Sequence, residues 1–403
     1  MLEKEYEIQD KQMKLLYFTI QINMLGGLAK IVIDKINWLV EHGYEVTLCN
    51  IERLDIVPAY PIDGRVKLVR GDISTEPGGV LTRFKGVIGA VKRVKEIILE
   101  EKPDVIVNAH CPLVTWIIPW MKFKSSNGSR VQKVVEMHQS RQGLEVFNKQ
   151  FMSPFGRWLH RWSIRWIYGK YDRFVVLTNG DREAWNTKNC VTIPNFASVS
   201  PTDFTEDTDK SSKQIVMLAR LMPQKRIDLM IRVWAKLAKD FPDWHVKVLG
   251  DGMLKDDLAK LTRNLGVEDS FLMPGAVKDV NAELEASDIL CLTSEYEGFG
   301  IVLIEAMLKH VPVMAFEYVG VHDIIEEGVD GYVVPFGDVD AYAERLRALI
   351  VSEELRNTFA NNALESVKKF DKERVMDKWV RLFADFLPQK NAETLNAARK
   401  PRC

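Results

Sequence analysis

Long apolar runs and clustered cysteines are both missing from this 403-residue chain. No stretch of 18 apolar residues occurs, so the sequence predicts no membrane-spanning helix. Its five cysteines lie far apart and form no Cys-x-x-Cys pair or Cys/His cluster, which argues against a disulfide framework and a structural zinc site. That cysteine usage is typical of a reducing compartment, and we expect a cytoplasmic protein.

The chain also lacks a Gly-x-Gly-x-x-Gly fingerprint, a Walker loop and any large net charge. Charge is nevertheless unevenly placed, because residues 1–200 hold 28 basic and 21 acidic side chains while the remainder holds 27 and 35. Either the first half meets an anionic ligand or surface, or the asymmetry is chance. We expect no nucleic-acid partner.

Short apolar strands alternate with amphipathic helices, which predicts parallel sheets built from β-α-β units. Residues 1–12 are expected to form a disordered lead-in without the apolar core of a signal peptide. A polar linker, Ser198–Ser212, separates a first domain (13–197) from a second (213–370), and a final helix (372–387) is expected to join the first. The expected strands are 14–20, 45–50, 104–109, 133–137 and 174–178 in the first domain, and 214–219, 245–249, 289–292, 313–316 and 332–334 in the second.

Residues that follow the strands are the candidate ligand contacts, because open parallel sheets bind ligands beyond the carboxyl ends of their strands. Gly26-Gly27 precedes a helix, where paired glycines let backbone amides approach a phosphate, although a plain tight turn explains them equally well. Arg220, Lys225 and Arg226 gather at a later helix start. Cations there oppose the helix dipole unless an anion binds, and the alternative is solvated surface charge.

Glu305 is the only charged residue in the apolar helical run 301–308. A buried carboxylate needs a partner. Lys309, one turn later, would make a structural ion pair, whereas a ligand with two hydroxyls, such as a ribose, would make a functional contact. Glu297 precedes the same helix, between polar residues and the glycine-rich Gly298-Phe-Gly300, whose amides could face a phosphate or a sugar.

Two histidines and one acidic triplet complete the candidates. His110 and His138 each follow a predicted strand, and His138 is favoured as functional because its loop is polar, although a structural histidine is the common case. Asp338-Val-Asp340 has the Asp-x-Asp form that can hold a divalent metal. Because it precedes a helix, we expect it to cap that helix and we expect no metal site.

Taken in order, the motifs of the second half resemble those of glycosyltransferase family 4, the retaining GT-B enzymes. The segment from Arg220 to Lys225 is similar to the family's Gly-Arg-Leu-x-x-x-Lys, with Ala219 in place of glycine. Gly250-Asp-Gly252 resembles its Gly-x-Gly turn, and Glu297 with Glu305 fits its Glu-x7-Glu signature. The first half is similar through Gly26-Gly27, His138 and Pro194-Asn195, although Phe196 stands where the family has glycine.

This resemblance implies an α/β GT-B fold, in which two Rossmann-like parallel-sheet domains face each other across a cleft. The first domain would bind the acceptor and the second the nucleotide sugar. It implies transfer of a hexose or N-acetylhexosamine from a nucleotide diphosphate sugar, expected to be UDP-linked, to a saccharide acceptor with retention of configuration. Neither a metal nor another cofactor is implied, and the setting is cell-surface polysaccharide synthesis.

The resemblance also implies individual roles. Arg220 and Lys225 would bind the donor diphosphate with a backbone amide of Gly27, Glu305 would bind the ribose, and Glu297 the donor sugar. The other implied contacts are His138 and the backbones of Phe299 and Gly300 with the donor sugar, Asn195 with a substrate, and Val277 and Lys278 with the nucleobase.

Residues 151–171 carry arginines at 157, 161 and 165 and tryptophans at 158, 162 and 166. On a helix these form an arginine stripe beside a tryptophan stripe, a pattern that suits the membrane interface. A peripheral protein on the inner membrane face, with a lipid-linked acceptor, follows from that interpretation. The alternative is that the tryptophans pack on the sheet while the arginines are solvated.

Two other functions remain open. One is a different GT-B chemistry, such as a sugar phosphorylase or a nucleotide-sugar epimerase; no lysine motif for pyridoxal phosphate stands out, and the Glu-x7-Glu pair favours transfer. The other is a catalytically inactive GT-B module that serves as a binding partner. The presence of Arg220, Lys225, Glu297 and Glu305 argues against the inactive module.

Overall fold

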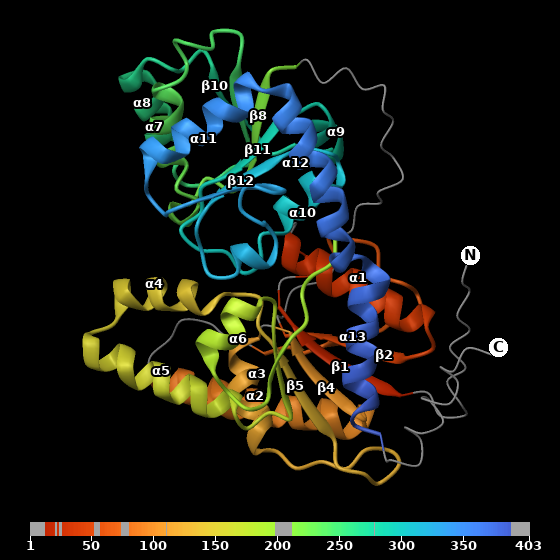
Figure 1. Ribbon diagram of the computed structural model, residues 1–403. Helices are drawn as coiled ribbons and strands as arrows, with labels where there is room; N and C mark the ends of the chain where they lie inside the picture. The colour runs from red at the N-terminus through yellow and green to blue at the C-terminus, as the bar shows by residue number, and fades with distance from the viewer. Residues whose placement is uncertain are drawn as a thin grey trace, which may run out of the picture.

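The computed structural model describes residues 13–20, 22–23, 26–51, 57–73, 80–109, 111–197, 212–277 and 279–387. Within them the chain forms two α/β domains, one above the other in Figure 1. Each domain is built on one sheet, with seven strands in the first and six in the second. The expected fold class is therefore confirmed. The predicted lead-in and nearly all of the predicted linker lie outside the described residues.

The first sheet has the order β3-β2-β1-β4-β5-β6-β7, and its pairs are parallel. Its strands are β1 (Lys14–Thr19), β2 (Glu45–Asn50), β3 (Lys67–Arg70), β4 (Val105–Ala109), β5 (Gln132–Glu136), β6 (Arg173–Val176) and β7 (Cys190–Thr192). Five of these lie where the apolar runs predict strands. The edge strands β3 and β7 were not predicted, because β3 is mostly exposed and β7 is only three residues long.

Helices cover both faces of this sheet (Figure 1). They are α1 (Gly27–Glu41), α2 (Val80–Glu101), α3 (Pro112–Ile117), α4 (Arg141–Phe151), α5 (Pro154–Tyr168) and α6 (Asn179–Trp185). The strand order reverses between β1 and β4, which is the point where doubly wound sheets bind ligands. The turn after β1 leads into α1, so Gly27 opens a helix at that point.

The second sheet repeats this topology in the order β10-β9-β8-β11-β12-β13. Its strands are β8 (Gln214–Leu218), β9 (His245–Leu249), β10 (Phe271–Gly275), β11 (Ile289–Leu292), β12 (Val313–Phe316) and β13 (Gly331–Val334). Its helices are α7 (Ile227–Ala235), α8 (Lys255–Leu265), α9 (Val280–Glu285), α10 (Ile301–Leu308), α11 (Val339–Val351) and α12 (Glu353–Ser366). Here the switch point lies between β8 and β11, so the loops that carry Arg220 and Glu297 start side by side.

The last helix, α13 (Lys372–Ala384), packs on the first domain (Figure 1). Its buried Val375, Trp379 and Phe383 share one hydrophobic core with residues of α1 and of the first sheet. The indole nitrogen Nε1 of Trp38 also donates to Glu373 Oε1 at 2.8 Å. The chain thus crosses back to its first domain after completing the second.

Hydrogen bonds join the loops at the carboxyl ends of the two sheets. Asn179, at the start of α6, donates its backbone N–H and its side-chain amide to Asp323 at 2.7 and 2.8 Å. The Gln142 side chain donates to the Glu295 carbonyl and accepts from the Val319 N–H, both at 3.0 Å. These contacts hold the carboxyl end of the first sheet against loops of the second domain, including the loop that bears Glu297.

Candidate functional site

Lys225 and Glu297 meet directly after strands β8 and β11. The Lys225 ammonium lies 2.6 Å from Glu297 Oε1, and the Ser294 hydroxyl donates to the same oxygen at 2.6 Å. Both charged side chains are largely buried, with 14% and 12% exposed. The Thr293 hydroxyl donates to the Lys225 carbonyl at 2.8 Å and couples the two loops. An ammonium with three donors still has capacity for a further anionic acceptor here.

Arg220 is exposed, and no hydrogen bond or ion pair joins its guanidinium to another described residue. Its loop is held by the Gly250-Asp-Gly252 turn. A Cβ on Gly250 would lie 2.1 Å from the Ala219 carbonyl oxygen, and one on Gly252 would lie 2.5 Å from the Leu221 oxygen. The turn therefore requires glycine for close backbone packing, and in the described residues it leaves the Arg220 guanidinium available to a ligand.

Glu305 lies on α10, and its carboxylate has no hydrogen bond or ion pair to another described residue. The structure instead gives Lys309 an ion pair with Glu285, at 2.7 Å between Nζ and Oε1. Burial raises the pKa of Glu305 above its ordinary value, and the nearby Lys30 ammonium of α1 offsets part of that rise. A half-buried carboxylate without a partner among the described residues is suited to accept hydrogen bonds from a ligand.

The first turns of α1 and α10 face each other. A Cβ on Gly27 would lie 3.9 Å from the Ile301 side chain, which opens α10. Both helices begin without a side-chain cap, so their first backbone amides keep free hydrogen-bonding capacity. Two uncapped helix N-termini this close together favour an anion beside them.

Two glycines after Glu297 allow close approach at the domain interface. A Cβ on Gly298 would lie only 1.9 Å from the His138 carbonyl oxygen. Gly300 has a φ of 91° and would place a Cβ 2.3 Å from the Tyr318 hydroxyl, which itself donates to the Phe299 carbonyl at 3.2 Å. The Phe299 ring is buried and its carbonyl accepts from Tyr318, so the backbone N–H is the group of this residue that remains for a ligand.

His138 belongs to a buried charged cluster that sequence reasoning missed. The Lys35 ammonium of α1 lies 2.5 Å from both carboxylate oxygens of Glu136, and the two side chains are only 1% and 2% exposed. His138 Nε2 lies 3.1 Å from Glu136 Oε1, outside hydrogen-bond geometry. Burial would raise the pKa of Glu136, but Lys35 and His138 outweigh it and hold that pKa at about 2.

The other predicted site residues are more scattered. Asn195 is half-buried after β7, and Val277 packs against the core of the second domain. Lys278 and His110 lie outside the described residues. Among the residues that can be placed, the structure brings together Gly27, Lys225, Glu297, Glu305 and the backbone of His138 around the first turns of α1 and α10.

The acidic triplet caps a helix, as predicted. Asp338 Oδ1 accepts from the Ala341 N–H at 3.0 Å at the start of α11. Asp340 makes an ion pair with Lys236 at 2.7 Å. Within the described part of the chain, no three His, Cys, Asp or Glu side chains group as metal ligands.

The tryptophans of α5 do not pack on the sheet. Trp158, Trp162 and Trp166 are 59%, 56% and 42% exposed, and Trp162 stacks on Trp166 at 6.1 Å between ring centroids. Trp120, also exposed, lies 5.1 Å from Trp166. The alternative that buries this stripe is therefore wrong. None of the described helices is both long and apolar enough to cross a bilayer.

Two parallel-sheet domains that bring cations, carboxylates and helix N-termini together at their interface are typical of GT-B glycosyltransferases. Family models agree, since residues 25–200 match the model described as glycosyltransferase family 4 and residues 201–366 match that of glycosyl transferases group 1. The chain belongs to the group 1 glycosyltransferases.

Two known relatives are similar to this chain over most of their length. The amylovoran biosynthesis glycosyltransferase AmsD of Erwinia amylovora is 24% identical over 390 residues, which covers 91% of this chain and 98% of that protein. A Campylobacter jejuni α-1,4-N-acetyl-D-galactosaminyltransferase, named for a PP-undecaprenol saccharide, is 26% identical over 311 residues, or 76% and 80% of the two chains. HepE of Anabaena, solved with UDP and glucose, has a TM-score of 0.70 at 17% identity over 93% and 100% of the chains, which supports the fold.

Proposed function

We propose that this glycosyltransferase moves a hexose or N-acetylhexosamine from a UDP-sugar to a saccharide acceptor, with retention of anomeric configuration, in cell-surface polysaccharide synthesis. One observation carries the proposal: Lys225, Glu297 and Glu305 gather where the N-termini of α1 and α10 face each other. AmsD, named for amylovoran biosynthesis, and HepE, solved with UDP and glucose, support the donor and the setting. A transfer assay over a panel of nucleotide sugars tests it, and no transfer from any UDP-sugar would contradict it.

Each grouped residue has a proposed role. Arg220 and Lys225 neutralise the donor diphosphate, together with the amides at Gly27 and the two helix dipoles. Glu305 accepts hydrogen bonds from the ribose hydroxyls. Glu297 binds the donor sugar. Nearby, His138 and the backbones of Phe299 and Gly300 complete the sugar site, Asn195 contacts a substrate, and Val277 and Lys278 lie by the nucleobase.

In the proposed reaction, the bond between the sugar's anomeric carbon and the diphosphate oxygen breaks while the acceptor hydroxyl attacks the same face. The acceptor proton passes to the leaving phosphate oxygen. Positive charge develops on the sugar and negative charge on the leaving diphosphate. Lys225, Arg220 and the helix N-termini stabilise the latter without a metal ion, because they are fixed before the reaction begins.

We predict that Arg220→Ala and Lys225→Ala each weaken UDP binding about 10-fold or more, because a charge-assisted hydrogen bond contributes about 1.5–3 kcal/mol. Isothermal titration calorimetry with UDP measures this. Arg347→Ala is a matched control, since Arg347 is exposed and pairs with Asp240 on a remote surface. Wild-type affinity in both site variants would remove these residues from the diphosphate site.

Metal independence gives a second test. Transfer is expected to proceed at an unchanged rate after dialysis against EDTA, because the cationic side chains and helix N-termini carry the charge of the leaving group. Loss of activity in EDTA, with recovery on addition of Mn²⁺ or Mg²⁺, would show that the donor diphosphate needs a metal ion.

We further propose that the acceptor is lipid-linked and that α5 contacts the cytoplasmic membrane face. Its exposed Trp158 and Trp162 lie beside Arg157 and Arg161, which matches the aromatic and cationic anchors of interfacial helices. The Campylobacter relative named for a PP-undecaprenol saccharide supports a lipid-linked acceptor. Sedimentation with anionic vesicles tests membrane contact, with the Trp158→Ser/Trp162→Ser variant expected to bind less.

A further inference from the structure

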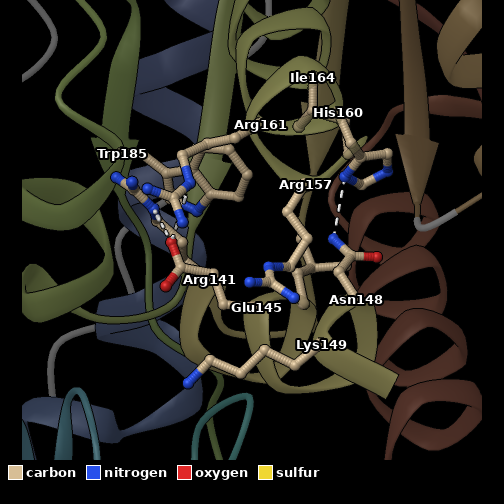
Figure 2. Close-up of a pocket in the computed structure, with 10 residues that line it drawn as sticks. Arg141, Glu145, Asn148, Lys149, Arg157, His160, Arg161, Ile164 and Trp185 are labelled. Atoms are coloured by element: carbon tan, nitrogen blue, oxygen red, sulfur yellow. Dashed lines mark hydrogen bonds and ion pairs between the residues drawn. The ribbon is translucent and has the colours of Figure 1, made fainter. Parts of the chain in front are cut away.

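A basic pocket lies between α4 and α5, apart from the donor site. It opens to solvent, and the free space between its lining residues, open solvent included, measures about 440 Å³. Four cations line it, Arg141, Lys149, Arg157 and Arg161, whereas Glu145 is its only carboxylate among the described lining residues. Figure 2 shows the guanidinium groups of Arg141 and Arg161 beside that carboxylate.

The charges of this pocket do not cancel. Arg141 Nε donates to Glu145 Oε1 at 3.2 Å, and Arg161 Nε lies 3.5 Å from the same oxygen, so one carboxylate pairs with two cations. Arg157 donates to the Met152 carbonyl at 3.2 Å, and no carboxylate of the described residues forms an ion pair with Arg157 or Lys149. Such an excess of like charge is unfavourable until an anion binds.

A neutral histidine adds a donor to the same pocket. Asn148 Nδ2 lies 2.9 Å from His160 Nδ1, and because the amide nitrogen can only donate, Nδ1 accepts and Nε2 carries the proton. Burial lowers the pKa of His160 below its ordinary value, so the ring adds no charge at neutral pH. With its one carboxylate already shared, the pocket offers mainly donors, and it suits a ligand rich in oxygen acceptors.

The pocket also lies between two surfaces that matter for transfer. On one side, the first turn of α4 touches the loop of Glu297, since Gln142 bonds the Glu295 carbonyl and a Cβ on Gly143 would lie 2.6 Å from the Tyr296 ring. On the other side is the exposed aromatic face of α5, with Trp158 and Trp162. An anion held here would therefore lie between the helix that touches the Glu297 loop and an apolar surface.

We propose that the pocket between α4 and α5 binds the phosphate or diphosphate group that links the acceptor saccharide to its lipid. This inference rests on the proposed function and adds the chemical class of the acceptor. Arg157 and Arg161 present planar forks that match diphosphate oxygens in a bidentate manner. The saccharide then extends toward Glu297, and the lipid chain lies along the tryptophans of α5.

Binding of farnesyl diphosphate, measured by calorimetry with UDP at saturation so that the donor site is occupied, tests the proposal. Arg157→Gln and Arg161→Gln are each expected to weaken binding about 10-fold. Arg165→Gln is the matched control on the same helix, because Arg165 bonds the Asn186 carbonyl outside this pocket. Farnesol, which has the same chain without the anion, is expected to bind at least 10-fold more weakly than the diphosphate.

Three results would overturn the proposal. Farnesol could bind as tightly as farnesyl diphosphate, or the Arg157 and Arg161 variants could bind the diphosphate as the wild type does. In the third, the Arg157 and Arg161 variants lose binding to phosphatidylglycerol-containing vesicles but still bind farnesyl diphosphate. That result would mean that the arginines contact membrane headgroups. By contrast, the protein could bind farnesyl diphosphate tightly and transfer no sugar. That result would contradict the proposed function but would still support diphosphate binding in this pocket.

Discussion

Replacing Glu297 by Gln is expected to lower the turnover number for sugar transfer about 100-fold or more while UDP affinity stays within about twofold. Glu297 holds both Lys225 and Ser294 by the same carboxylate oxygen, at the end of β11. Charge and geometry change at the sugar during transfer, so a negative carboxylate there interacts differently with the ground state and the transition state. UDP lacks the sugar, and Gln keeps an oxygen for Lys225.

Glu305→Gln provides the contrast. Ribose contacts change little during transfer, so this variant is expected to weaken UDP binding about 10-fold and to leave the turnover number at saturating donor nearly unchanged. Calorimetry with UDP and a transfer assay, run on both variants, separate binding from turnover. The assignment fails if Glu297→Gln loses UDP affinity in proportion to its activity, or if Glu305→Gln binds UDP as tightly as the wild type.

The fold could be predicted from sequence because its signals are local. Buried parallel strands form short apolar runs, and ten of the thirteen strands in the described residues lie within two residues of the expected ranges. The strand-end rule also indicated Lys225 and Glu297 as neighbours, and the structure brings them together because the ends of β8 and β11 lie side by side. Edge strands with exposed side chains, such as β3, lack that signal.

Partners of charged side chains could not be predicted, because they depend on how distant elements pack. Lys309 follows Glu305 by one helical turn, yet its ion pair is with Glu285 on α9. Likewise, the arginine and tryptophan stripes of α5 have the same sequence pattern whichever face is buried. The structure shows that Ile167 and Tyr168 anchor this helix while Trp158 and Trp162 stay exposed.

The same limit applies to Lys35 and Glu136, which lie 101 residues apart and pair inside the first domain. Lys35→Met is expected to lower the free energy of unfolding by about 3–5 kcal/mol, because it leaves a buried carboxylate unpaired. The Lys35 ammonium also lies 4.2 Å from the ring centroid of Trp379, so the substitution weakens the packing of α13 on the first domain as well. Urea unfolding followed by tryptophan fluorescence measures the loss.

The pH dependence follows from Glu136. Its pKa is about 2 in the folded protein, below the ordinary value of 4.5, so the folded state binds this proton less readily than the unfolded chain. The resulting stabilisation is complete above pH 4.5 and is lost as the pH falls toward 2. Glu136→Gln should remove part of the acid sensitivity of the wild type, and identical acid unfolding of the two proteins would contradict this origin.

The double variant Lys35→Met/Glu136→Leu distinguishes a costly unpaired charge from a favourable pair. Apolar replacement of both partners of a buried ion pair is often neutral or stabilising, so the double variant is expected to recover most of the stability that Lys35→Met loses. Its transfer rate then reports on His138, because Glu136 Oε1 lies 3.1 Å from His138 Nε2 and the His138 carbonyl packs on Gly298 beside Glu297. If stability recovers while the transfer rate stays reduced about 10-fold, the Lys35–Glu136 pair orients His138 for the reaction. If both recover, the pair contributes to folding stability alone.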